Sequence, residues 1–61
     1  MRLKELRKKK GATQKEVAIA IGCSALNYSR YERNEREPDI KTLKDLSKYF
    51  NQSIDYIVGN D

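Results

Sequence analysis

The chain is 61 residues long, with 36% charged residues, a formal net charge of +4, one cysteine and no histidine. A single cysteine excludes an internal disulfide framework, and without histidine a zinc site would have to be built from carboxylates. The longest apolar run, residues 17–21, is too short to span a bilayer, and the first residues lack the apolar stretch expected of a signal peptide. We therefore expect one small cytoplasmic domain with no metal, cofactor or membrane partner.

The positive charge is concentrated in the first part of the sequence. Residues 1–36 hold ten Lys/Arg and four Asp/Glu, a net charge of +6, whereas residues 37–61 hold three and five, a net charge of −2. This asymmetry suits a molecule that faces a polyanion with one side. A solvated helix face is the alternative, and charge alone does not separate the two interpretations.

In chain order, the first predicted helix covers about residues 2–9 and stops at Gly11. Thr13 opens a second helix, and Glu16, three residues later, completes a capping box. Gly22 ends this helix because glycine tolerates a positive φ.

Ser24 caps a third helix, which Asn34 can close in the left-handed conformation. Pro38 stops any continuation, a fourth helix follows from about Asp39 to Phe50, and a short fifth lies within residues 53–59. Apolar residues at helical spacing predict the buried faces. They are Leu3, Leu6, Val17, Ala18, Ile21, Tyr28, Tyr31, Ile40, Leu43, Leu46, Tyr49, Phe50, Ile54, Ile57 and Val58. The loops are short, so we predict an all-α, compact five-helix bundle forming one domain, residues 1–61.

Residues 14–33 resemble two helices joined by a tight turn, the helix-turn-helix arrangement. Ala18 is small enough for a close helix crossing, and Gly22 supplies the turn. Because Tyr28 and Tyr31 point inward, the opposite face of the third helix must point outward. That face, which would enter a DNA major groove, comprises Ala25, Leu26, Ser29, Arg30 and Arg33.

The sequence resembles the phage repressor and Cro (XRE-like) helix-turn-helix family over nearly its whole length. The resemblance lies in Thr13-Gln14-Lys15-Glu16-Val17-Ala18, Gly22-Cys23-Ser24, Ser29-Arg30-Tyr31-Glu32-Arg33-Asn34, Glu37-Pro38-Asp39-Ile40 and Ser53-Ile54-Asp55-Tyr56-Ile57-Val58-Gly59. It implies a transcription regulator, a repressor by preference, that binds an operator in double-stranded DNA. It also implies a homodimer on a palindromic site, for which Tyr56 and Val58 are candidate interface residues.

The resemblance also assigns roles to individual positions. Residues expected at base edges are Gln14 (there or at a phosphate), Ala25, Leu26, Ser29 and Arg30. Residues expected at phosphates are Asn27, Arg33, Asn34 and Arg36. Arg7 and Glu32 are expected to form a structural ion pair. Among these, Arg30 can also be argued from its chemistry, because a guanidinium can bind guanine O6 and N7 together.

Two other classes of function compete with DNA binding. A protein-interaction or antitoxin-type module could use the same bundle to bind a protein partner. An enzyme is disfavoured because there is no histidine, cysteine pair or phosphate loop, and a small-molecule ligand is not indicated.

Cys23 is interpreted as a small core residue rather than a redox switch. Lys8, Lys9 and Lys10 fit phosphate contact and a solvated run equally well.

Overall fold

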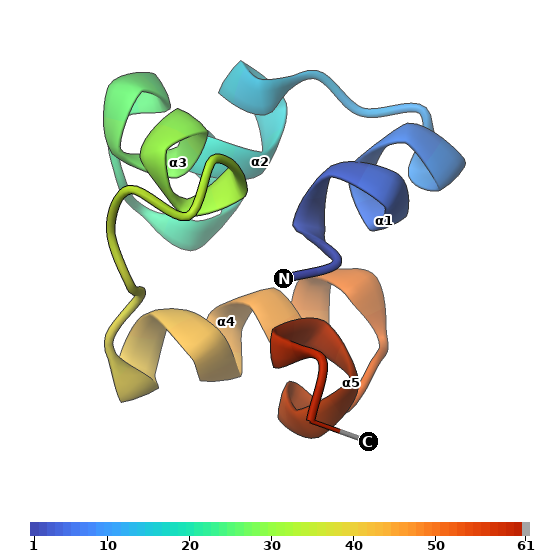
Figure 1. Cartoon of the computed structure of the whole chain (residues 1–61). Helices are drawn as coiled ribbons and strands as arrows, with labels where there is room; N and C mark the ends of the chain where they lie inside the picture. The colour runs from blue at the N-terminus through green and yellow to red at the C-terminus, as the bar shows by residue number, and fades with distance from the viewer. Residues whose placement is uncertain (61) are drawn as a thin grey trace.

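The computed structural model describes residues 1–60, and this part of the chain is helical, with no strand (Figure 1). Five α-helices follow one another within residues 1–60: α1 (Leu3–Lys10), α2 (Gln14–Ile21), α3 (Ala25–Glu32), α4 (Ile40–Phe50) and α5 (Ile54–Val58). Helix α2 packs against α3, and α4 contacts α1, α2 and α5. The predicted all-α class and five-helix architecture are therefore confirmed.

Side-chain caps explain where four of the helices begin. The Thr13 hydroxyl accepts the backbone N–H of Glu16 at 3.0 Å, and the Glu16 carboxylate accepts the N–H of Thr13 at 2.8 Å, which completes the capping box of α2. The other three caps each accept a backbone N–H three residues later, and they are Ser24, Asp39 and Ser53. Helix α1 lacks such a cap, because Arg2 precedes it, and begins one residue later than predicted.

Helix ends fall where the backbone turns left-handed. Gly22, with φ at +76°, ends α2 and lets α3 start after a two-residue turn. Asn34 and Asn51 adopt positive φ after α3 and α4, at 58° and 54°. Asparagine tolerates this conformation better than most residues, so both helices stop without a glycine.

The core is formed by one apolar face of every helix. Its nine buried hydrophobic residues are Leu3, Leu6, Val17, Ala18, Ile21, Tyr28, Tyr31, Leu46 and Ile57. Pro38 is also buried, in the loop that carries the chain from α3 to α4. One predicted core position is wrong: Ile40 is 70% exposed. It is the first residue of α4, and the part of this helix that packs on the bundle begins about one turn later.

Within residues 1–60, no helix is long and apolar enough to cross a membrane.

Candidate nucleic-acid interface

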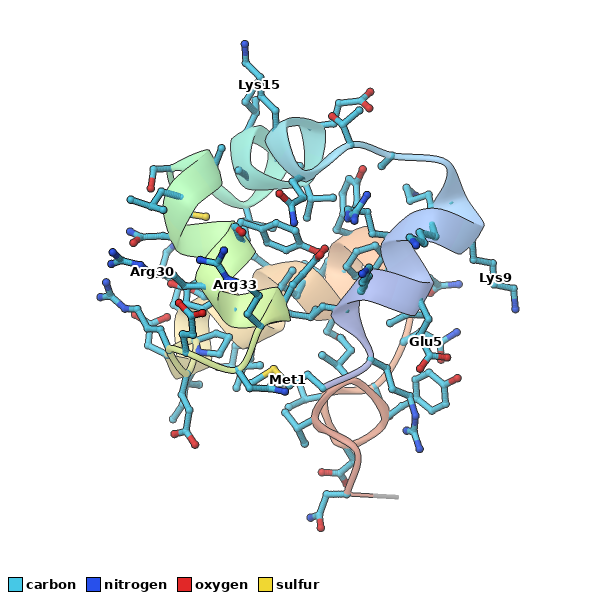
Figure 2. All side chains as sticks on the ribbon, turned by 45° about the horizontal axis from the view of Figure 1, so that its top comes forward. Met1, Glu5, Lys9, Lys15, Arg30 and Arg33 are labelled. Atoms are coloured by element: carbon cyan, nitrogen blue, oxygen red, sulfur yellow. The ribbon has the colours of Figure 1, made fainter. Side chains whose placement is uncertain are left out.

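Helix α3 divides sharply into a buried face and a solvent face. Tyr28 and Tyr31 are 0% and 6% exposed, whereas Leu26 on the other side is 57% exposed. Ala25 and Arg30 are also exposed. Figure 2 shows Arg30 and Arg33 on the α3 side of the molecule. The inward tyrosines thus leave a row of side chains from Ala25 to Arg30 turned outward.

Two of the residues predicted for this surface are less exposed than expected. Ser29 and Asn27 are half-buried, because they lie at the edges of the outward row rather than on its crest. The Asn27 carbonyl oxygen accepts a hydrogen bond from Arg36 Nη1 at 3.4 Å. This contact to Asn27 Oδ1 brings the loop that follows α3 back alongside the helix, and it leaves the side-chain Nδ2 of Asn27 available as a donor.

The arginines on this side differ in their partners. Among residues 1–60, Arg30 forms neither an ion pair nor a side-chain hydrogen bond, so its guanidinium donors are uncommitted. Arg33 Nε lies 3.1 Å from Glu35 Oε2, but both side chains are more than half exposed. An ion pair that is so exposed contributes little stability and can be exchanged for another anion.

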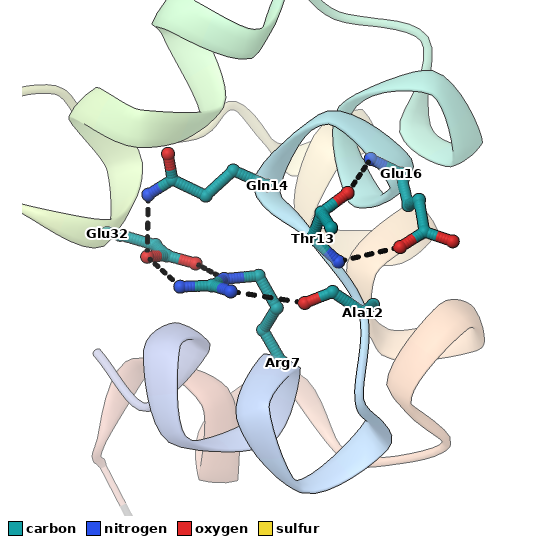
Figure 3. Close-up of polar contacts among 6 residues, drawn as sticks. All are labelled: Arg7, Ala12, Thr13, Gln14, Glu16 and Glu32. Atoms are coloured by element: carbon teal, nitrogen blue, oxygen red, sulfur yellow. Dashed lines mark hydrogen bonds and ion pairs between the residues drawn. The ribbon is translucent and has the colours of Figure 1, made fainter.

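The expected pair between Arg7 and Glu32 is formed. Arg7 Nε donates to Glu32 Oε2 at 2.6 Å and Nη2 to Oε1 at 3.3 Å. The two side chains are 14% and 3% exposed. A third guanidinium donor, Nη1, binds the carbonyl oxygen of Ala12 at 3.1 Å. One arginine therefore joins α1, the α1–α2 loop and the end of α3 (Figure 3).

Gln14 belongs to the same network, which the sequence did not reveal. Its Nε2 donates to Glu32 Oε1 at 3.0 Å, and Figure 3 shows the amide between α2 and α3, with its carbonyl oxygen turned away from Glu32. Eighteen residues separate the two, and no local pattern links such distant positions. Of the predicted DNA-contacting residues, Gln14 alone is held by this buried pair.

The network sets the charge of Glu32. Burial raises the pKa of this carboxyl, but its contacts with Arg7, with the neighbouring Tyr28 hydroxyl and with Gln14, together with the charge of Arg7, outweigh burial, so the pKa lies below its ordinary value. The Tyr28 hydroxyl is also buried next to this pair, and within residues 1–60 it has no partner at hydrogen-bonding geometry. Burial raises the pKa of Tyr28, so this hydroxyl stays neutral at physiological pH.

Other features of the surface have structural roles. Cys23 is half-buried against the core, and burial raises the pKa of its thiol, which suits a packing residue more than a reactive one. The Arg2 guanidinium lies 4.3 Å from the centre of the Tyr56 ring, and Val58 borders a groove with Leu43. Residues 1–60 contain no cluster of His, Cys, Asp or Glu that could hold a metal ion.

Two short helices joined through Gly22 and packed against each other, the second with one face in the core and the other exposed to solvent, define the class of helix-turn-helix domains. The model of the helix-turn-helix family matches residues 3–57, and the chain belongs to that family. This confirms the resemblance to the phage repressor and Cro (XRE-like) family.

Curated relatives share nearly the whole of this chain. HTH-type transcriptional regulator ImmR of Bacillus subtilis (strain 168) is 50% identical over 98% of the chain and 47% of its own length. Uncharacterized HTH-type transcriptional regulator YqaE of the same organism is 41% identical over 97% of the chain and 51% of its length. Cryptic phage CTXphi transcriptional repressor RstR of Vibrio cholerae is 29% identical over 97% of the chain and 53% of its length. The chain thus spans about half the length of these relatives. No solved structure matches it significantly.

Proposed function

We propose that this chain is the sequence-specific DNA-binding domain of a transcription regulator, with α3 as the helix that enters the major groove. The observation that carries the proposal is the outward row of α3, where Arg30 stands exposed and unpaired beside the small or apolar Ala25 and Leu26. Relatives named as transcriptional regulators, and one named as a repressor, support the same assignment and favour repression.

Each side chain of the row suits a different part of a base pair. Arg30 can donate two parallel hydrogen bonds to guanine O6 and N7. Ala25 and Leu26 offer only carbon, so they would contact thymine methyl groups, and Ser29 can bind an adjacent base edge.

Residues that flank the row would bind the DNA backbone. Arg33 can exchange its exposed Glu35 partner for a phosphate, and Asn27 and Arg36, which already contact each other, would meet a phosphate together. Asn34 lies at the same end of α3, where its side-chain oxygen accepts a hydrogen bond from the N-terminal ammonium group at 3.4 Å. These contacts fix orientation on the duplex and carry no sequence information of their own.

A homodimer on a palindromic operator is the form in which such a domain would act. One copy offers a single short reading helix, which specifies only a few base pairs. Two copies related by a two-fold axis read twice that length, and the half-sites then lie about one DNA turn apart.

The test is a binding selection from a randomised duplex pool, run at low and near-physiological salt. We expect a palindromic consensus with a guanine in each half-site, and binding to it should persist at the higher salt. Binding without enrichment that disappears as salt rises would show attraction to phosphates alone. That outcome would favour the protein-interaction or antitoxin-type module instead.

Arg30→Ala on the selected duplex tests the assignment of the reading helix. We expect about 1–3 kcal/mol weaker binding and relaxed preference at the guanine. Lys44→Ala, an exposed lysine of α4 outside the helix-turn-helix unit, is the matched charge control and should leave the preference unchanged. If Arg30→Ala weakens selected and scrambled duplexes equally, Arg30 is an electrostatic contact and does not read a base.

A further inference from the structure

Gln14 is the predicted DNA-contacting residue whose side chain is held by the buried Arg7–Glu32 pair. It is the first residue of α2 and half-buried, and its amide nitrogen donates to the Glu32 carboxylate at 3.0 Å. Glu32 is therefore the side chain that decides how the Gln14 amide is turned.

A carboxylate can only accept hydrogen bonds, so it must face the NH2 end of the amide. The other Glu32 oxygen is bound by Arg7 Nε at 2.6 Å, which fixes the carboxylate and leaves it no freedom to turn away from Gln14. The Gln14 carbonyl oxygen consequently points away from Glu32, as Figure 3 shows. One of the two amide hydrogens also stays uncommitted, because only one is used by Glu32.

This orientation selects among the groups that DNA offers. A phosphate carries only acceptor oxygens, so it could bind only the one free N–H, whereas the amino group of a base can also donate to the carbonyl oxygen. A glutamine that presents an oxygen and an N–H together matches the N6 and N7 edge of adenine. We propose that Glu32 is a positioning residue for DNA recognition, which holds the Gln14 amide with its oxygen away from the carboxylate so that Gln14 binds an amino-bearing base edge rather than a phosphate.

This inference rests on the proposed function and makes Glu32 act only through Gln14. The test is a double-mutant cycle with Gln14→Ala, Glu32→Gln and the combined variant. Glu32→Gln keeps the shape of the side chain but can face Gln14 with either an oxygen or an amide nitrogen, so the Gln14 amide is no longer held in one orientation. Each protein is titrated with the duplex selected by the unmodified chain and with a scrambled duplex, at several salt concentrations.

We expect Gln14→Ala to lower the preference for the selected duplex about tenfold, within the range for one base-directed contact, without changing the salt dependence. Glu32→Gln should lower the preference several-fold alone and have no further effect when Gln14 is alanine. A contact from the neutral Gln14 amide to a phosphate would instead weaken the selected and scrambled duplexes equally and leave the preference unchanged when it is removed. That result, or losses that add in the combined variant, would overturn the inference.

Stability needs a separate control, because Glu32 also supports the fold. Ile57→Val lowers core stability in α5, far from the interface, and should weaken both duplexes equally while leaving the preference intact. If Glu32→Gln does not fold, Glu32→Asp replaces it, because it keeps the charge but withdraws the carboxylate from Gln14. An unmodified chain that prefers no duplex would overturn the proposed function itself. Additive losses on a duplex that it does prefer would overturn the role of Glu32 alone.

Discussion

Glu32 is the residue on which three parts of the chain converge. Its 3% exposed side chain accepts hydrogen bonds from Arg7 in α1 and from Gln14 in α2, while its own backbone ends α3. A buried carboxylate is costly unless it is paired, and here two donors satisfy it. The position of the reading helix relative to α1 therefore depends on this side chain as well as on apolar packing.

Removing Arg7 should destabilise the domain mainly through the carboxylate that it leaves behind. We expect Arg7→Ala to lower the free energy of unfolding by about 3 kcal/mol, the lower end of the range for breaking a buried pair, since Gln14 still binds Glu32. For a chain this small, such a loss lowers Tm by more than about 10 °C. A thermal melt at neutral pH measures this change.

The pH dependence of the same melt provides its control. The pKa of Glu32 is lowered in the folded state, so its contribution is present above its unfolded pKa of about 4.3 and is lost as pH falls through the lower folded value. In Arg7→Ala, Glu32 has lost the partner that lowers its pKa most, while burial still raises that pKa. The difference in Tm between the variant and the parent protein should therefore shrink as the pH falls. A difference in Tm that stays constant down to pH 3 would contradict the pairing.

What the sequence revealed about single residues depended on how local the signal was. Helical spacing identified the inward tyrosines and the outward Arg30, because orientation within one helix follows from its period. The hydrogen bond from Gln14 to Glu32 and that from Arg36 to Asn27 were not predicted. Which side-chain atoms meet across elements depends on the packed arrangement of the helices. The Arg7–Glu32 pair was expected only because of the family resemblance.

At the scale of elements, the sequence was most informative about where helices begin and end. Ser24, Asp39 and Ser53 bind their own helix three residues away, so their effect is contained in a few consecutive residues. The same local pattern gave a wrong prediction at Ile40. Its spacing fits the buried stripe of α4, but the first turn of that helix extends past the core. Periodicity gives the direction of a side chain but not whether a neighbouring helix covers it.

The turn between α2 and α3 offers a test at this scale. Gly22 has φ at +76°, and a Cβ added there would meet no atom within 4 Å, so only backbone strain opposes a larger residue. Gly22→Ala should lower the free energy of unfolding by about 1–2 kcal/mol, the cost of left-handed backbone for an ordinary residue. Gly22→Asn should cost clearly less, because this chain already places Asn34 and Asn51 in that conformation. Urea unfolding compares the three proteins, and equal stability of the alanine and parent proteins would show that the turn tolerates side chains freely.

The dimensions of the whole molecule limit how two copies can share DNA. The domain measures 27 × 23 × 18 Å, and reading helices on successive major grooves of one DNA face lie about 34 Å apart. Because the longest dimension of the domain is shorter than that separation, two copies could meet there only along this dimension and through their side chains, and copies a further turn apart could not meet at all. A dimer on a palindrome should therefore be sensitive to the spacing of the half-sites and not only to their sequence.

Spacer variants of the selected duplex test this geometry. The parent spacing should give cooperative binding. An insertion of about 5 base pairs moves one half-site to the opposite face of the DNA, and an insertion of about 10 restores the face without restoring the contact between copies. Both insertions should reduce binding to that of two independent half-sites, whose affinity falls steeply with salt because phosphates then dominate. Titration monitored by fluorescence anisotropy, with a single half-site as reference, measures each case. Equal affinity per half-site at all three spacings would mean that the copies bind DNA as independent monomers.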